Sequence, residues 1–552
     1  MGQEAVAAGL RELAARGFSG MGYVGEQRMF RGTLASPRGP LSVAILIQDW
    51  DFLEYPTIIV TDGMKKFPQL RPHLDVHGGL CYFARRSVVL DRYDAGTAVA
   101  QCLEQAQAVL GKILDDRNYV VQDIQNEFLV HWDRAEPPAM PFYLVGVAPQ
   151  ARSARIHFDQ AGNRALLSDN AAEAQALASC MGWGQLSEAM NRCWLFRSDK
   201  LPPVPGHFPA TVEEFFSWLR QWDQRLSHAI QHHFATDAAY EYERLVMAVH
   251  MPAGWIGVMF APRPPGKLTC GQMKAYLHGR GGSTPIQRLT VTDVSAEFVH
   301  SRNLSFKNLT GKRITLVGCG AIGSQLAPAL VRLGAGQGQQ GLLRLVDEED
   351  LMAENLGRHY LGYNRLGQPK ARALRDEIER QFPLAKLDDL SKAVQDLRLD
   401  VMRDDLLIDA TGDQAVSEFL NGQWLDAKRP LPVLYVWIKG NGECVQSLWC
   451  AGQEDACFHC LRVPDAEAYR KDRHPVLKRA PELKRLGCHA FTPYAVSSGL
   501  QAAALATDVI CDWLQGRMSP RFRTRSRENV DVHHVASMDL PPLSGCLACT
   551  PH

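Results

Sequence analysis

The feature that most constrains the fold is a glycine-rich turn that connects an apolar run to a helical pattern. The run Ile314–Val317 leads into Gly318-Cys-Gly320-Ala-Ile-Gly323, and the helical pattern continues to Leu333. Glycines in such a turn let backbone amides approach a phosphate at the helix N-terminus, where about half a positive charge resides. The turn therefore predicts a nucleotide site on a parallel sheet covered by helices.

Polar residues after the next strand indicate which nucleotide this site takes. The strand-like run Leu342–Val346 ends at Asp347, the acidic position expected to hold a ribose hydroxyl, and Asn355, Arg358 and Lys370 follow. These three residue types suit a site that grips a triphosphate and neutralises the charge of a displacement at phosphorus. Hydride transfer has no such need, so the pattern favours ATP and argues against a nicotinamide-dependent oxidoreductase.

Cysteine spacing predicts a closed zinc site in the same part of the chain. The two knuckles are Cys457-Phe-His-Cys460 and Cys546-Leu-Ala-Cys549. Paired thiolates at this spacing wrap one tetrahedral zinc ion, and a set of cysteines with no open position makes a structural site. The chain has 14 cysteines in 552 residues, which is too dilute for a disulfide scaffold.

From about residue 292 to the C-terminus these motifs resemble the ThiF/MoeB family of adenylyltransferases, whose larger members are ubiquitin-activating enzymes. The resemblance implies a Rossmann-like adenylation domain that is usually dimeric, with catalytic roles for Arg358 and Lys370 and with zinc on the knuckles. It also implies an ATP site formed by Gly318, Gly320, Gly323, Asp347, Asn355, Arg358 and Lys370.

The resemblance further implies a Mg²⁺-binding aspartate after the run Leu406–Asp409. We assign this catalytic role to Asp413, although Gly412 occupies the expected position when no gap is allowed. The family also takes an arginine from the N-terminal flank of the first strand. Arg302 is the nearest candidate, and an ordinary exposed arginine is the alternative.

Cys488 lies between the two knuckles in the basic segment Lys484-Arg-Leu-Gly-Cys488-His489. Basic neighbours lower the pKa of a thiol and so supply thiolate at neutral pH. Cys488 resembles the catalytic cysteine of activating enzymes, and a structural thiol is the alternative. Other cysteines fall in strand or helix patterns, where we expect buried packing residues: Cys319, Cys444, Cys450 and Cys511.

Residues 1–135 read as a compact α+β unit. Helical patterns over residues 4–17 and 96–114 enclose strand-like runs over 22–32, 41–47 and 55–60. The later helix places Val99, Leu103 and Leu110 on one buried face. A proline-rich break, Glu136–Pro141, marks the end of the unit, because consecutive prolines disfavour both helix and sheet.

Within this unit the segment His73-Leu-Asp75-Val-His-Gly-Gly-Leu-Cys81 resembles the active-site turn of ubiquitin-conjugating enzymes. The resemblance implies that Cys81 is the acyl acceptor and that His73 supports the turn, with Cys102 as the core alternative. Asp75 stands where that family usually has an oxyanion-donating asparagine. An ionised carboxylate cannot donate, so either another group stabilises the oxyanion or Asp75 deprotonates the incoming amine.

Residues 136–291 carry no motif with a clear chemical meaning. Strand-like runs over 142–147 and 255–260 alternate with helical patterns over 211–233 and 238–250. We expect an α+β linker or docking domain. The predicted order is therefore a conjugating-type domain at 1–135, this linker at 136–291 and an adenylation domain at 292–552, in a mixed α/β fold.

This order resembles the ubiquitin-transferase-like fusions of bacterial CBASS antiphage operons. The resemblance implies ATP- and Mg²⁺-dependent activation of a protein C-terminus, a thioester on Cys488, transfer to Cys81 and conjugation to an amine. The implied substrate is a cGAS-like nucleotidyltransferase or a ubiquitin-like protein, the implied state is a homodimer, and some hinge motion is needed. The alternative is a sulfur-carrier or ubiquitin-like protein adenylyltransferase whose N-terminal domain only binds a partner.

Composition narrows the partners further. Lys and Arg total 60 and Asp and Glu total 60, so the formal net charge is zero. The chain as a whole therefore has no positive charge that would attract nucleic acid or anionic lipid. We find no apolar run of about 18 residues and no signal peptide pattern at the start of the chain. We therefore expect a cytoplasmic protein with neither a nucleic-acid nor a membrane partner.

Overall fold

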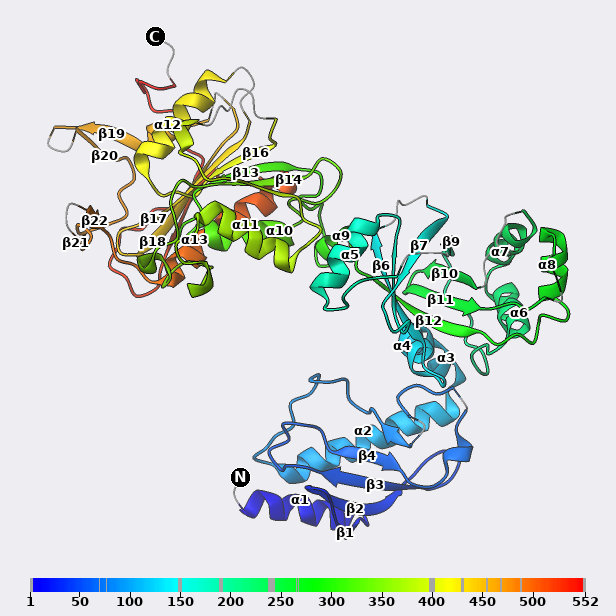
Figure 1. Ribbon diagram of the computed structural model, residues 1–552. Helices are drawn as coiled ribbons and strands as arrows, with labels where there is room; N and C mark the ends of the chain where they lie inside the picture. The colour runs from blue at the N-terminus through cyan, green and yellow to red at the C-terminus, as the bar shows by residue number, and fades with distance from the viewer. Residues whose placement is uncertain are drawn as a thin grey trace.

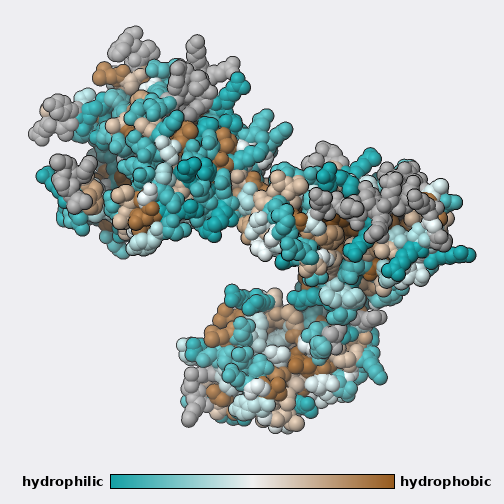
Figure 2. Space-filling model, in the orientation of Figure 1, coloured by the Kyte–Doolittle hydropathy of each residue, from teal (hydrophilic) through white to brown (hydrophobic). Residues whose placement is uncertain are grey.

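The computed structural model describes residues 3–68, 70–75, 77–146, 151–187, 192–236, 244–264, 266, 268–396, 403–427, 431–452, 455–466, 469–486 and 489–549. The chain forms three units in sequence order, and the fold is mixed α/β as predicted (Figure 1). On the face shown in Figure 2, the first and third units each adjoin the middle unit and stand apart from one another. None of the described helices is long and apolar enough to cross a bilayer.

The first unit is an antiparallel sheet in the order β1-β2-β3-β4-β5, covered by two long helices. Its elements are α1 Gln3–Ala15, β1 Ser19–Val24, β2 Gln27–Leu34, β3 Leu41–Ile47, β4 Thr57–Val60, β5 Gly79–Leu80 and α2 Ala95–Asp115. The apolar face predicted for α2 is fully buried in the core of this unit. The single run predicted over 22–32 is a hairpin instead, because Gly25 has a φ of +61° between β1 and β2.

Two short helices join the first unit to the second. α3 Arg117–Asn126 buries Val120 and Ile124 in the first core, whereas α4 Phe128–Arg134 buries Phe128 and Trp132 in the second. Trp132 Nε1 also donates to the Leu289 carbonyl at 3.0 Å. The α3–α4 junction is therefore packed on both sides rather than being a free linker.

The middle unit is a closed barrel in the order β10-β11-β12-β6-β8-β7-β9. Its strands are β6 Met140–Gly146, β7 Ser153–Phe158, β8 Ala165–Ser168, β9 Arg192–Arg197, β10 Leu245–Met251, β11 Gly254–Phe260 and β12 Gln287–Asp293. Its helices are α5 Ala171–Cys180, α6 Val212–Trp222, α7 Gln224–Thr236 and α8 Cys270–Leu277.

The helical prediction for 238–250 is wrong where the structure describes that segment, because Leu245–Met251 is strand β10. Leu245, Met247 and Val249 pack under α6–α8, while Val246 and Ala248 fill the barrel interior. Both faces of the strand are buried, so the sequence shows a continuous apolar run without the alternation that identifies a strand.

The third unit is a sheet in the order β15-β14-β13-β16-β17-β18-β23, parallel as far as β17 and antiparallel beyond it. Its strands are β13 Arg313–Val317, β14 Leu342–Val346, β15 Leu387–Leu390, β16 Leu406–Asp409, β17 Val433–Lys439, β18 Cys444–Cys450 and β23 Phe522–Ser526. Its helices are α9 Ala296–Ser301, α10 Gly323–Arg332, α11 Lys370–Gln381, α12 Gln414–Asp426 and α13 Val496–Leu514. The strand order reverses at β13, and ligands of such sheets bind beyond the carboxyl ends of the strands at that point.

Candidate functional site

The glycine turn lies at this reversal, between β13 and α10. Gly318 has a φ of +86°, and a Cβ there would meet backbone atoms of Thr411 at 2.8 Å. A Cβ on Gly323 would lie 1.8 Å from the Gly318 carbonyl oxygen. A Cβ on Gly320, in contrast, would meet no described atom within 4 Å. Gly318 and Gly323 therefore allow the close backbone packing within the turn. Gly320 leaves space on the open side of the turn, where a ligand can approach.

The peptide of Cys319 is fixed from two directions within this turn. Asp347 Oδ2 accepts from the Cys319 amide at 2.7 Å, and burial raises the pKa of the Asp347 carboxyl. His359 Nδ1 accepts from the Leu361 amide, so Nε2 carries the proton and donates to the Cys319 carbonyl at 2.7 Å. Burial lowers the pKa of His359 to about 4, which keeps the ring neutral. No spacing in the sequence indicated His359.

The three residues predicted to hold the triphosphate lie beyond β14. Lys370 begins α11, is buried, and pairs with Glu349. Asn355 Oδ1 accepts from the Met352 amide at 2.9 Å, which leaves the side-chain amide protons for another partner. The guanidinium carbon of Arg358 lies 5.0 Å from the centre of the Tyr494 ring.

The segment after β16 contains the aspartate assigned to Mg²⁺. Asp413 is exposed and caps α12, because its Oδ1 accepts from the Ala415 and Val416 amides at 2.8 and 3.2 Å. Asp409 is buried and accepts from Thr411 Oγ1 at 2.6 Å, so it fastens the segment rather than facing solvent. The remaining Asp413 oxygen suits a cation, and its Mg²⁺ role stays a prediction. Arg302 is exposed and stacks over Phe298.

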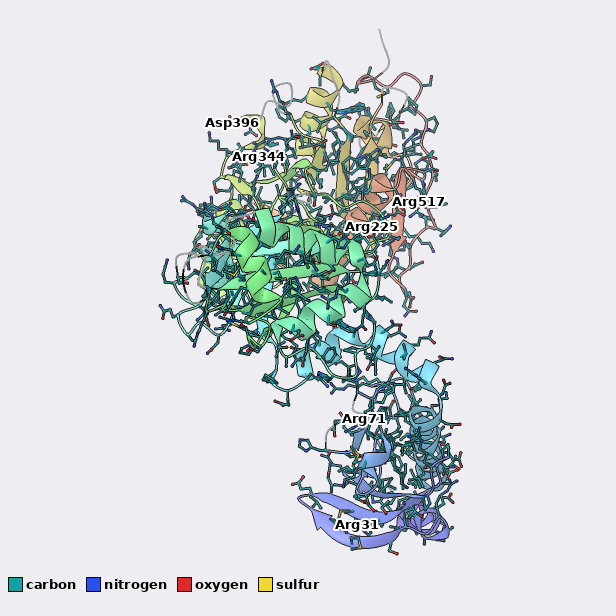
Figure 3. The ribbon with its side chains drawn as sticks, turned by 90° about the vertical axis from the view of Figure 1, so that its right-hand side faces the viewer. Arg31, Arg71, Arg225, Arg344, Asp396 and Arg517 are labelled. Carbon is teal, nitrogen blue, oxygen red and sulfur yellow. The ribbon has the colours of Figure 1, made fainter. Side chains whose placement is uncertain are left out.

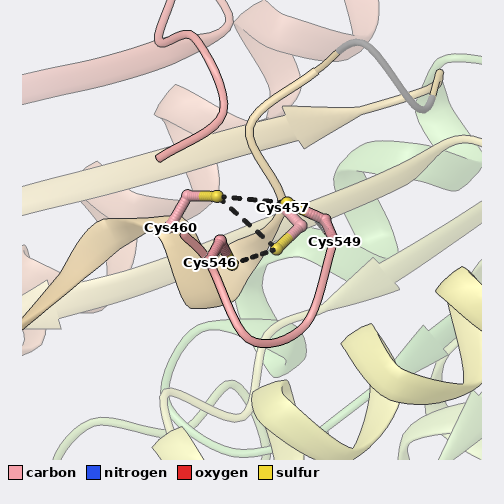
Figure 4. A group of neighbouring side chains, drawn as sticks. All are labelled: Cys457, Cys460, Cys546 and Cys549. Atoms are coloured by element: carbon pink, nitrogen blue, oxygen red, sulfur yellow. Dashed lines mark hydrogen bonds between the residues drawn. The ribbon is translucent and has the colours of Figure 1, made fainter. Parts of the chain in front are cut away.

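The two cysteine knuckles come together beside the same sheet (Figure 4). The Sγ–Sγ distance is 3.7 Å for Cys457 and Cys460, 3.9 Å for Cys457 and Cys546, and 3.5 Å for Cys460 and Cys549. Four sulfurs at about 2.3 Å from a tetrahedral zinc ion stand about 3.8 Å apart. The residues therefore fit the metal that their spacing predicted.

Cys488 lies outside the described residues, but both of its flanks are described. They form the antiparallel pair β21 Lys484–Leu486 and β22 His489–Phe491. Asn441 Nδ2 donates to the Glu482 and Pro493 carbonyls, each at 3.0 Å, and so ties the segment to the turn after β17. Gly499 of α13 approaches the glycine turn closely, since a Cβ there would meet the Ala321 carbonyl at 2.5 Å. The described flanks are thus tied to the turn after β17, and the start of α13, which follows them, packs against the glycine turn.

Cys81 follows the short edge strand β5 at the end of a tight loop. Gly78 has a φ of +86°, and a Cβ there would meet the Val60 carbonyl oxygen at 2.3 Å, so the loop requires glycine. Asp75 Oδ1 accepts from the His77 and Gly79 amides at 2.8 Å each. The Cys81 amide in turn donates to the His73 carbonyl at 2.8 Å. Asp75 therefore fixes the loop that presents Cys81.

Figure 3 shows on which side of the first unit this loop lies. Arg71, which donates to the Asp75 carbonyl, is on the side toward the barrel, whereas Arg31 of β2 is on the far side. The Cys81 residue is exposed, yet partial burial of its thiol and the charges of Glu127 and Asp123 raise the pKa of that thiol. The structure thus places α3 and α4 next to the cysteine, which the sequence did not indicate.

We expect the raised pKa of Cys81 to appear in its alkylation by iodoacetamide, followed by peptide mass spectrometry. The thiolate is the reactive form, so alkylation should be slow at pH 8 and should accelerate through a midpoint above the ordinary thiol value of about 8.5. The exposed Cys180 serves as the internal reference for reagent and quenching. A midpoint at or below the ordinary value would contradict the influence of Glu127 and Asp123.

Two parts of the chain match known families. Residues 294–537 match the ThiF family, and residues 23–141 match prokaryotic E2 family B. The first match contains the glycine turn and Lys370, and the second contains Cys81.

Curated relatives match the chain over most of its length. The chain is 27% identical over 565 residues to the "ATP-dependent ubiquitin transferase-like protein Cap2" of Pseudomonas aeruginosa (strain BWHPSA011 / Pa011), with 99% of each chain covered. It is 24% identical to the protein of the same name from Vibrio cholerae, with 86% of each covered. A crystal structure of E. coli MccB with ATP shows 15% identity and a TM-score of 0.33, covering 44% of this chain and 68% of that one. The resemblance predicted from the motifs is confirmed.

Proposed function

We propose that this chain, a homologue of the ATP-dependent ubiquitin transferase-like proteins along nearly its whole length, activates a protein C-terminus and conjugates it to an amine. A carboxylate oxygen of the substrate attacks the α-phosphorus of ATP, and pyrophosphate leaves. The Cys488 sulfur then attacks the acyl-adenylate and AMP leaves. The Cys81 sulfur displaces Cys488, and an amine finally displaces Cys81. Each covalent intermediate divides one high barrier into smaller ones.

The main support for the proposal is that one chain contains two sites, a nucleotide site and an exposed cysteine. The glycine turn with Asp347 and Lys370 provides the nucleotide site, and the exposed Cys81 on its ordered loop provides a remote acceptor. An adenylyltransferase that only charges a sulfur carrier has no use for the second site. Neither site alone supports conjugation.

A pocket of about 200 Å³ supports a peptide tail as the substrate. Its lining includes Gly412, which is next to the nucleotide site, the aromatic residues Trp437 and Phe522, and Phe458 between the first pair of knuckle cysteines. The ion pair of Lys439 Nζ with Asp472 Oδ2 at 2.7 Å crosses its wall. An extended C-terminus in this pocket would deliver its carboxylate toward the glycine turn.

Further parts of the proposal concern partners and metals. We propose a cGAS-like nucleotidyltransferase or a ubiquitin-like protein as the activated substrate, a homodimer formed through the adenylation domain, and a cytoplasmic location. Asp413 would hold a Mg²⁺ ion, which supplies charge neutralisation for the pyrophosphate. The four clustered cysteines would hold zinc as a structural ion.

The proposed function is tested by mixing the purified chain with ATP and proteins that have exposed C-terminal tails. We expect ATP–pyrophosphate exchange that depends on the tail, together with thiol-sensitive adducts on Cys488 and Cys81 in non-reducing gels and mass spectra. Exchange with an adduct on Cys488 alone would favour the carrier adenylyltransferase and contradict conjugation. Absence of exchange with every tail would contradict activation itself.

The zinc proposal predicts about one zinc ion per chain in metal analysis of the purified protein. A Cys457→Ser substitution should remove it and lower the melting temperature of the C-terminal unit, because structural zinc contributes on the order of 10 kcal/mol to folding. A Cys511→Ser chain, changed at a partly buried cysteine of α13, is the matched control and should keep the metal. Equal zinc content in both variants would contradict the site.

A further inference from the structure

The last step of the proposed reaction needs a group that takes a proton from the incoming amine, because an ammonium ion has no lone pair for attack. Asp75 is poorly suited, since its Oδ1 accepts from two amides of its own loop. The structure places other carboxylates beside Cys81. They lie on α3 and at its junction with α4.

Three side chains form this cluster: His73, Asp123 and Glu127. Their ligating atoms all lie within 4.8 Å of one another. His73 Nε2 lies 2.8 Å from Asp123 Oδ2, and both side chains are about one-fifth exposed. Glu127 is exposed and precedes α4. The carbonyl of His73 accepts from the Cys81 amide, so the cluster and the thiol are joined through one residue.

The charges around the thiol favour a cation over an anion. Glu127 and Asp123 disfavour the Cys81 thiolate and raise the pKa of that thiol. The same field attracts an ammonium ion, because a positive charge close to two carboxylates is stabilised where a thiolate is repelled. The site is thus suited to receive a protonated amine.

Other titratable groups that face the cluster do not cancel this field. Burial raises the pKa of Tyr119 on α3 to about 12, so its phenol is neutral at pH 7. Burial lowers the pKa of His131 on α4, which leaves its ring neutral at pH 7. Nearby positive charge comes from Arg134, which acts on His131, and from Lys112, whose Nζ lies 5.5 Å from the centre of the Tyr119 ring.

We propose that Glu127 and Asp123 bind the ε-ammonium group of the acceptor lysine and accept its proton, with His73 as the positioning residue that orients Asp123. This inference rests on the proposed function. One ammonium proton moves to a carboxylate, and the freed nitrogen attacks the thioester carbon. The carbon–sulfur bond breaks, a second nitrogen proton moves to the Cys81 sulfur, and an amide remains. The carboxylate then releases its proton to water.

The test separates loading of Cys81 from discharge. The full chain is loaded with ATP and a tail-bearing substrate, ATP is removed with apyrase, and loss of the Cys81 thioester to added lysine is followed by mass spectrometry. A chain with Asp123→Asn and Glu127→Gln should load normally and discharge to lysine about 100-fold more slowly at pH 7. The deficit should shrink as the pH approaches the lysine pKa of about 10.4, where the amine needs no base.

Two controls make the result specific. Hydroxylamine, whose nitrogen is unprotonated at neutral pH, should discharge both chains at the same rate. Glu104→Gln removes a carboxylate of α2 that pairs with Arg16 and should leave lysine discharge unchanged. A wild-type chain that forms no Cys81 thioester would contradict the proposed function, whereas normal loading with equal lysine discharge in the variant would contradict this inference alone.

Two further outcomes would also overturn the inference. A deficit that is independent of pH, or one shared by hydroxylamine, would assign the carboxylates a structural role. Loss of lysine discharge from the loaded wild-type chain on addition of a chelator would assign the cluster to a metal ion. A His73→Gln chain should show a smaller deficit with the same pH trend, as expected for a residue that acts through Asp123.

Discussion

A Cys81→Ala chain is expected to keep tail-dependent ATP–pyrophosphate exchange and to lose conjugate formation by about 10³-fold or more, as is typical when a covalent nucleophile is removed. The first unit should remain folded, because Cys81 is exposed and its loop is held by backbone bonds to Asp75 and His73. The two readouts are pyrophosphate exchange and conjugate on a denaturing gel. The variant should also accumulate the thioester on Cys488, since its acceptor is missing.

The matched control is Cys511→Ala, which removes a partly buried thiol near the end of α13 and should leave both readouts unchanged. Undiminished conjugate formation by the Cys81→Ala chain would contradict the proposed transfer of the acyl group from Cys488 to Cys81. It would leave the first unit as a docking module and support an enzyme that only adenylates.

A Gly323→Ala chain is expected to lose nucleotide binding. The added methyl would lie 1.8 Å from the Gly318 carbonyl oxygen, which is backbone and cannot move without opening the turn. Such overpacking costs about 3 kcal/mol, equivalent to roughly 100-fold in affinity. Calorimetric titration with ATP measures the loss, and pyrophosphate exchange should fall with it.

Gly422→Ala is the matched control for this substitution, because Gly422 lies on the exposed side of α12 and its Cβ would meet no described atom within 4 Å. Alanine stabilises a helix interior by up to about 1 kcal/mol relative to glycine, so this chain should bind ATP normally. If the Gly323→Ala chain bound ATP with the same affinity as this control, the assignment of the turn to the nucleotide would be wrong.

Local patterns in the sequence predicted much of the two outer units. The strand over 41–47 and the runs Leu342–Val346 and Leu406–Asp409 have the predicted bounds, and the helix predicted over 96–114 is one residue longer at each end. In each case apolar spacing and a turn signal act together over a short stretch. The two cysteine knuckles, far apart in the chain, also meet as their spacing predicted.

The middle unit shows where such patterns fail. Strand β10 is buried on both faces, by the barrel interior and by helices, so it has no alternation to distinguish it from a helix. The closure of the barrel depends on pairings between distant strands, such as β12 with β6, which no local spacing reveals.

The residues of the candidate sites also differ in whether the sequence alone could locate them. Cys81 and the glycine turn could be located from short motifs, although their catalytic roles stay predictions. His359, Asp123 and Glu127 could not, because each reaches its partner through the tertiary fold rather than through spacing. Cys488 lies outside the described residues, so its surroundings stay a prediction from the sequence.

The closed barrel lies between two joints, one with the first unit and one with the third, and the joints are not equivalent. Glu127 lies at the α3–α4 joint beside Cys81, and because this joint is packed on both sides it holds the thiol in one orientation relative to the barrel. The opposite joint is the contact of Cys180 Sγ with the Arg380 carbonyl and of Leu384 with the core around Trp183. A small rotation at that far joint would move the barrel and the first unit together, and it would displace the Cys81 thiol much further than the same rotation at the nearer joint.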